Sequence, residues 1–146
     1  MFLDDVVNSG AIPALEMTMR FAGRRQQFLA HNIANLDTPN FQPQDVSTRG
    51  FQRMLGEAID RRRARTGGER GELEWRQTRE IRRDGRGGLE LRPRTPSPGI
   101  LFHDRNNRDL ERMMQDLVEN VAVFRIATDL LRGRYSQIQD AIAERV

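Results

Sequence analysis

Apolar residues recur at alternating intervals of three and four positions near both ends of the chain, but not between them. A repeat of about 3.5 residues keeps one seam of a helix facing a partner helix over many turns. The pattern predicts one long helix near each end, each needing another helix to cover its seam. The expected seam residues are Leu15, Met19, Ala22, Leu29 and Ile33 in the first helix, and Met114, Leu117, Val121, Phe124, Leu131, Tyr135 and Ile138 in the second.

The first helix is expected to run from about Pro13, which a first helical turn tolerates, to Ala34 or Asn35. Asn35 can adopt the left-handed conformation that often follows a last helical turn. Thr38 precedes a proline and is therefore expected to be extended, so the chain should leave the helix there.

The second helix is expected to begin after Asn106 or Asn107, either of which is a good N-cap, and to reach about Ala143. Asp109 would lie in its first turn, where the helix dipole favours a negative charge. Gly133 is the weak point of this helix.

The region between the two helices is rich in arginine, glycine and proline. A short helix is expected between Phe51 and Ala64, ended by the glycine pair at 67–68. Apolar residues then alternate with charged ones on both sides of the glycine-rich segment 84–88, which predicts a β-hairpin with one half-buried face.

These elements predict a mainly α fold, in which the two terminal helices form an antiparallel, coiled-coil-like hairpin beside a small irregular or β-hairpin middle. The expected divisions are 1–41, 42–105 and 106–146. The second seam is longer than the first, and the middle has too few apolar residues to cover the surplus. Either the two ends simply pack on each other or another subunit covers the excess. Gln26 and Thr128 are polar seam positions of the kind that fixes helix register.

Composition excludes several functional classes. The chain has no cysteine, and all 24 basic residues are arginine, so disulfides, thiolate metal sites and lysine-dependent phosphate loops are ruled out. The two histidines, His31 and His103, match no metal-site spacing, and no nucleophile motif is present. We therefore expect no enzymatic activity, cofactor, metal or small-molecule substrate.

Positive charge is concentrated in the middle of the chain. Fourteen arginines stand against eight acidic residues between Arg49 and Arg94. Such a segment can contact phosphates or an acidic protein surface, or can simply be solvated. The first residues, Met1 to Asp5, have neither a basic region nor a continuous apolar stretch, so a cleaved signal peptide is not expected.

The end of the first helix resembles the signature of flagellar axial proteins of the rod and hook class. That signature places Asn-Ile-Ala-Asn before Thr-Pro, a glycine and an aromatic residue. In this chain Asn40 stands at the glycine and Phe41 at the usual tyrosine. The residues that carry the resemblance are Asn32, Ile33, Ala34, Asn35, Asp37, Thr38, Pro39 and Phe41.

The second helix resembles the C-terminal helix of proximal rod proteins, through Asn106, Asn107, Asp109 and Leu110 and the apolar positions that follow. Arg108 stands where that family more often has an apolar residue. The resemblance covers about 11–46 and 102–143, and it does not extend to the arginine-rich middle.

The resemblance implies a structural subunit of the flagellar basal-body rod, whose terminal helices join a helical tube in the periplasm and transmit torque. Export through the flagellar type III apparatus would need no cleaved signal. The implied partners are copies of this chain, other rod proteins, the rod-to-membrane-ring adaptor and the MS ring. The alternatives are another rod or adaptor protein, or a coiled-coil protein that binds nucleic acid through the arginines; nucleic acid is not the expected partner.

Overall fold

The computed structural model describes residues 9–68, 70–95 and 110–144. Three helices, α2 (Ile12–Ala34), α3 (Thr48–Thr66) and α4 (Leu110–Ala143), account for most of these residues. Strands β1 (Ile81–Arg83) and β2 (Leu89–Leu91) form an antiparallel hairpin. The prediction of a mainly α fold with two long terminal helices and a small hairpin between them is confirmed.

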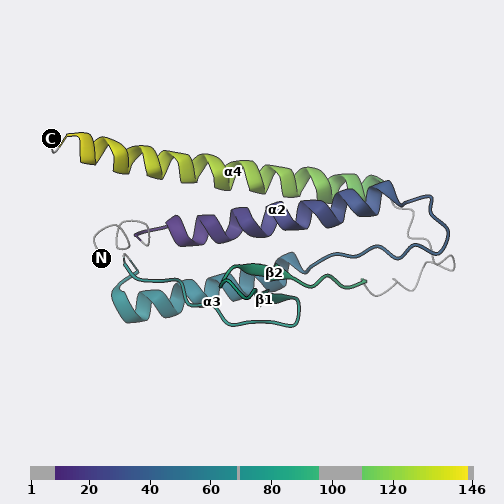
Figure 1. Cartoon of the computed structure of the whole chain (residues 1–146), viewed down its shortest axis with the longest axis horizontal. Helices are drawn as coiled ribbons and strands as arrows, with labels where there is room; N and C mark the ends of the chain where they lie inside the picture. Colours follow the sequence, from purple (N-terminus) through teal and green to yellow (C-terminus); the bar gives the residue numbers. More distant parts are fainter. Residues whose placement is uncertain (1–8, 69, 96–109, 145–146) are drawn as a thin grey trace.

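Helix α2 lies in the middle of the molecule, with α4 along one side and α3 and the hairpin along the other (Figure 1). Helices α2 and α4 run in opposite directions, as the predicted antiparallel hairpin requires. At about 1.5 Å per residue, the 34 residues of α4 span about 51 Å and the 23 residues of α2 about 35 Å. Part of α4 therefore extends past its partner.

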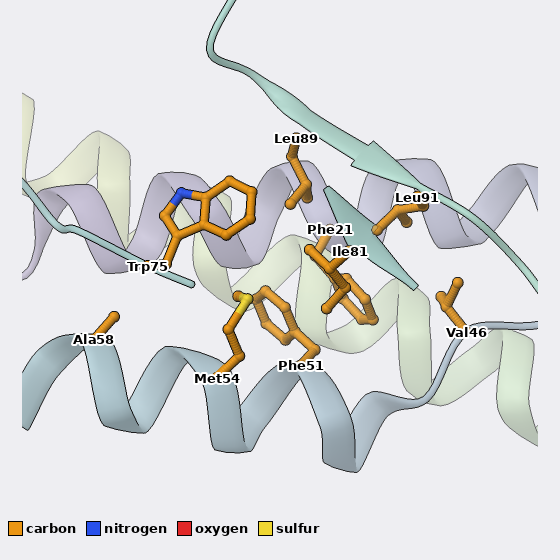
Figure 2. Close-up of a cluster of buried hydrophobic side chains, with 9 residues drawn as sticks. All are labelled: Phe21, Val46, Phe51, Met54, Ala58, Trp75, Ile81, Leu89 and Leu91. Carbon is orange, nitrogen blue, oxygen red and sulfur yellow. The ribbon is translucent and has the colours of Figure 1, made fainter. Parts of the chain in front are cut away.

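The main cluster of buried apolar side chains joins α2 to the middle of the chain and contains no residue of α4. The rings of Phe21 and Phe51 stack at its centre, 3.9 Å apart and 8° from parallel (Figure 2). Trp75 closes one end of the cluster, with the Arg83 guanidinium 5.0 Å from its ring. The core residues are Phe21, Val46, Phe51, Met54, Ala58, Trp75, Ile81, Leu89 and Leu91. The middle thus covers one face of α2, whereas α4 packs against another face of the same helix.

Ile81 pairs with Leu91, and Arg83 pairs with Leu89. Residues two apart on a strand and their cross-strand partners share one face of the hairpin, so Ile81, Leu89 and Leu91 all face this core. The outer edge of β1 is closed by its own chain: Thr78 exchanges hydrogen bonds with the backbone N–H and C=O of Ile81. The Gln77 amide oxygen accepts from the Arg83 N–H. This edge cannot add another strand without breaking those bonds.

The start of α2 is tied to the end of α3. The Arg62 guanidinium is buried and donates to the Gly10 carbonyl oxygen over 2.7 Å, just before α2 begins. Burial lowers the pKa of Arg62.

Gly67, with φ of 73°, takes the left-handed conformation that ends α3, so the predicted break at this glycine pair is confirmed. No helix in the described part of the chain is long and apolar enough to cross a membrane.

A matched pair of leucines tests the location of the core. Leu89 is 3% exposed and belongs to the core, whereas Leu130 on α4 is 54% exposed. Leu89→Ala should lower the free energy of unfolding by about 2–5 kcal/mol, because it removes buried methyl groups and leaves a cavity. Leu130→Ala should change it by less than about 0.5 kcal/mol. Urea titration followed by circular dichroism measures both; equal losses would contradict the core assignment.

Candidate assembly surface

The motif at the end of α2 folds the chain back through one buried asparagine. The Asn32 amide donates to the Gln44 carbonyl oxygen over 2.8 Å, and its oxygen accepts from the Gln44 N–H over 3.0 Å. Both polar groups of the side chain therefore pair with one backbone unit twelve residues away. This contact fixes the distance between α2 and the segment around Gln44, where the chain returns along the helix.

Thr38, Pro39, Asn40 and Phe41 form a tight turn in which the Phe41 N–H donates to the Thr38 carbonyl oxygen. Asn40 has φ of 60°, the conformation that a type II turn requires two residues after its start, with proline before it. Asparagine and glycine adopt this conformation most readily. The aromatic ring of Phe41 packs edge-on against His31, 5.5 Å away.

Asn35 ends α2 without the left-handed backbone expected of it. Its φ is −106°, and the left-handed residue is Asn40, five positions later. The physical reason is local bonding: the Asn35 side chain donates to the His31 carbonyl oxygen over 2.8 Å, while its own carbonyl accepts from Thr38. These bonds satisfy the last turn without a Schellman-type reversal.

A buried ion pair joins α2 to the returning chain. Arg25 is 7% exposed and forms two hydrogen bonds with the Asp45 carboxylate, from Nε over 2.9 Å and from Nη2 over 2.7 Å. Burial opposes the charge of Arg25, but the hydrogen bond and charge of Asp45 outweigh it and raise the pKa of Arg25. Asp45 also exchanges backbone hydrogen bonds with Arg94, beyond the hairpin. One residue thus links three parts of the chain.

Asp116 of α4 faces this pair. Burial raises the pKa of Asp116, and the negative charge of Asp45 adds to the shift, while the charge of Arg25 opposes it. The structure therefore brings a partly buried carboxylate of α4 close to a carboxylate that Arg25 already neutralises.

Polar contacts fix the register of α4 against α2. The buried Asn120 amide donates to the Ala22 carbonyl oxygen over 2.8 Å and to Gln26 Oε1 over 2.9 Å. The Tyr135 hydroxyl donates to Glu16 Oε1 over 2.8 Å, and this hydrogen bond raises the pKa of Tyr135. Gln26 thus has a partner across the interface. Within the described residues the Thr128 hydroxyl donates only to the Phe124 carbonyl oxygen of its own helix, so it fixes no register there.

Small residues let the two helices approach each other. A Cβ on Gly23 would lie 3.3 Å from the ring of Phe124.

The predicted seam residues of α2 are all buried or half-buried: Leu15, Met19, Ala22, Leu29 and Ile33. On α4, Leu117, Val121, Leu131, Tyr135 and Ile138 are likewise covered, whereas Leu110, Met114 and Phe124 are exposed. Asn106, Asn107 and Asp109 lie outside the described residues.

Helix α4 carries a row of exposed apolar side chains that nothing in the described chain covers. We call it the outer face; it comprises Leu110, Met114, Val118, Val123, Ile126 and Leu130. Five of these six follow one another at intervals of four or eight residues. The row therefore advances around the helix by about 40° for every four residues and turns by about 200° between Leu110 and Leu130. This is the i±4 ridge of helix packing rather than a straight coiled-coil seam.

Sequence reasoning missed Arg25 as a buried residue. Its spacing held the signal, because Ala22, Arg25, Leu29 and Asn32 follow one another at intervals of three and four. Its partner Asp45, twenty residues away, lies outside any helical periodicity. No group of three histidine, aspartate or glutamate residues in the described ranges could hold a metal ion.

The chain is similar to the flagellar basal body rod protein FlgB of Borrelia hermsii, with 27% identity over 125 residues. The similar stretch covers 81% of this chain and 84% of that protein. It is longer than α2 and α4 together, so it includes part of the middle of the chain. No protein-family model matches.

Two asparagines of the same motif give a matched test of the chain reversal. Asn32→Ala should lower the free energy of unfolding by about 1–3 kcal/mol, because it leaves both backbone groups of Gln44 without their partner. Asn35→Ala removes exposed, local bonds and should cost less than about 1 kcal/mol. Chemical denaturation of the two variants checks this order, and a larger loss for Asn35→Ala would refute it.

The raised pKa of Asp116 gives a dependence of stability on pH. The folded chain holds this proton more tightly than the unfolded chain, so the contribution is fully present below the unfolded pKa. It is lost as pH rises through the folded pKa. Asp116→Asn imitates the protonated form, so it should raise the melting temperature at neutral pH and leave it almost unchanged in acid.

Thermal unfolding of the parent chain and the variant across this pH range measures the effect. Asp140→Asn, an exposed position on the same helix, is the control and should alter neither value. If Asp116→Asn lowers the melting temperature at neutral pH, the net cost inferred for burying this charged carboxylate is wrong.

Proposed function

We propose that this protein is a structural, non-enzymatic subunit of the bacterial flagellar basal-body rod. Within that class it corresponds to the proximal rod protein FlgB. The single observation that carries the proposal is the outer face of α4, an apolar ridge with no cover in the described chain. The similarity to the FlgB of Borrelia hermsii supports the same assignment.

A row of six exposed apolar side chains is typical of a protein interface, because isolated soluble proteins seldom leave large contiguous apolar patches in water. Neighbouring subunits cover the outer face when the rod assembles. We propose that unlike surfaces of neighbouring subunits meet, because repeated head-to-tail contacts give an open helical assembly instead of a closed dimer.

The slant of the outer face indicates how a neighbour packs. Two helices that interlock through i±4 ridges cross at about −50°, whereas a coiled-coil seam holds them about 20° apart. We expect helices of adjacent subunits to cross α4 obliquely. Within one subunit α2 and α4, the first and third of the predicted divisions, form the inner-tube part, and the arginine-rich middle faces outward.

As a proximal rod subunit the protein lies in the basal body, in the periplasm, and passes torque from the membrane ring to the distal rod and hook. It reaches that place through the flagellar type III apparatus without loss of a signal peptide. Its partners are copies of itself, other rod proteins, the rod-to-ring adaptor and the MS ring. The motif residues from Asn32 to Phe41 set the path by which the chain leaves the inner helix.

Substitution on the outer face separates assembly from folding. Ile126 is 60% exposed, so Ile126→Asp should leave the helical content and melting temperature of the isolated chain nearly unchanged. In the assembled rod the same carboxylate would be buried without a partner, which is costly. We therefore expect loss of swimming in soft agar and of rods in purified basal bodies.

Gln139→Asp places the same charge at another exposed position of α4, outside the outer face, and should preserve swimming. Normal motility of the Ile126→Asp variant would exclude the outer face as a rod contact.

A further inference from the structure

A second surface carries a different signal. A groove of about 490 Å³ lies between the first half of α3 and the segment 76–81. Residues from one face of α3 form one wall, since Ser47, Gly50, Arg53 and Glu57 recur at intervals of three and four. The buried side chains of Met54 and Ile81 form the floor. We call this surface the arginine groove.

Four arginines line the arginine groove: Arg53, Arg76, Arg79 and Arg94. Some arginine side chains elsewhere in the middle of the chain have partners: Arg61 pairs with Glu57, and Arg65 with Glu74. No ion pair or side-chain hydrogen bond within the described residues engages the guanidinium groups of the four arginines in the groove. The same is true of Arg49, Arg63, Arg70 and Arg82, but only the four line one groove. All four are exposed, so the groove concentrates positive charge that folding does not use.

We propose that the arginine groove binds an acidic, extended segment of a partner protein. One carboxylate of the chain itself lies in the groove: Glu80 Oε2 accepts from the backbone N–H of Ser47 over 2.7 Å, beside the start of α3. The wall from Ser47 to Glu57 is about 15 Å long, at about 1.5 Å per helical residue. A chain that rises about 3.3 Å per residue would place four or five residues along it.

The chemistry of the groove favours a protein segment over a nucleic acid. The carboxylates of Glu57 and Glu80 lie among the arginines and would repel a continuous phosphate backbone, whereas a mixed-charge protein segment can avoid them. No aromatic side chain lines the groove, so it offers no platform for base stacking. The edge of β1 is closed by Thr78 and Gln77, so recognition depends on side chains and not on strand addition.

The inference does not depend on the proposed function, because it rests on charge in the middle of the chain and not on the outer face of α4. The test uses the full chain and fluorescence anisotropy with three labelled probes: a peptide of alternating glutamate and serine, its lysine counterpart, and a single-stranded oligothymidine. We expect the glutamate peptide to bind, with an affinity that falls as salt is added, and the lysine peptide not to bind.

Two double variants locate the binding site. Arg53→Gln with Arg79→Gln should weaken binding of the glutamate peptide roughly tenfold. Arg125→Gln with Arg134→Gln makes the same change of net charge on exposed positions of α4 and should have little effect. Glu57→Gln removes a repelling carboxylate from the groove and should strengthen binding.

Equal weakening by the two double variants would show that only net charge matters and would overturn the site. Tighter binding of the oligothymidine than of the glutamate peptide, lost in the groove variant, would overturn the class of partner. Circular dichroism of each variant confirms that these exposed substitutions leave the fold intact.

Discussion

Helix α2 must be covered on two opposite faces, and the rest of the structure depends on how this is done. One face carries Phe21 into the core against α3 and the hairpin. The other carries Ala22 and Gln26 to Asn120 of α4. The Arg25–Asp45 pair keeps the returning chain on the first face, and its two hydrogen bonds tolerate little sliding. Both layers therefore take their position from a single helix.

The two layers differ in what holds them. Core residues of the middle are almost wholly enclosed, whereas α4 buries only Asn120, Ala127 and Leu131. Hydrophobic stabilisation grows with the apolar area removed from water, so α4 gains less from the monomer than its length would allow. The polar contacts of α4 determine its position along α2 more than the strength of its attachment to α2. An element with this balance is well placed for a surface that a neighbour completes.

The sequence was sufficient for elements whose signal is local. Periodicity located α2 and α4, and glycine placement located the end of α3 and the hairpin turn. It could not supply contacts between distant residues, such as Phe21 with Phe51 or Arg25 with Asp45, because no local pattern links them. Local propensity also misplaced the left-handed residue, since Asn35 and Asn40 are equally suited to it and only the hydrogen bonds of the folded chain decide between them.

Helix α4 carries two sets of apolar residues with different spacings, and the coiled-coil interpretation of its sequence used only the first set. Residues at 3.5-residue spacing face α2 through Leu117, Leu131 and Ile138, while a second set, four residues apart, forms the outer face. A helix that served only one partner would need only the first set, with polar residues elsewhere. Apolar residues on the remaining side weaken solubility unless a contact uses them. The second periodicity is thus the feature of the sequence that distinguishes the proposed assembly subunit from a simple helical hairpin.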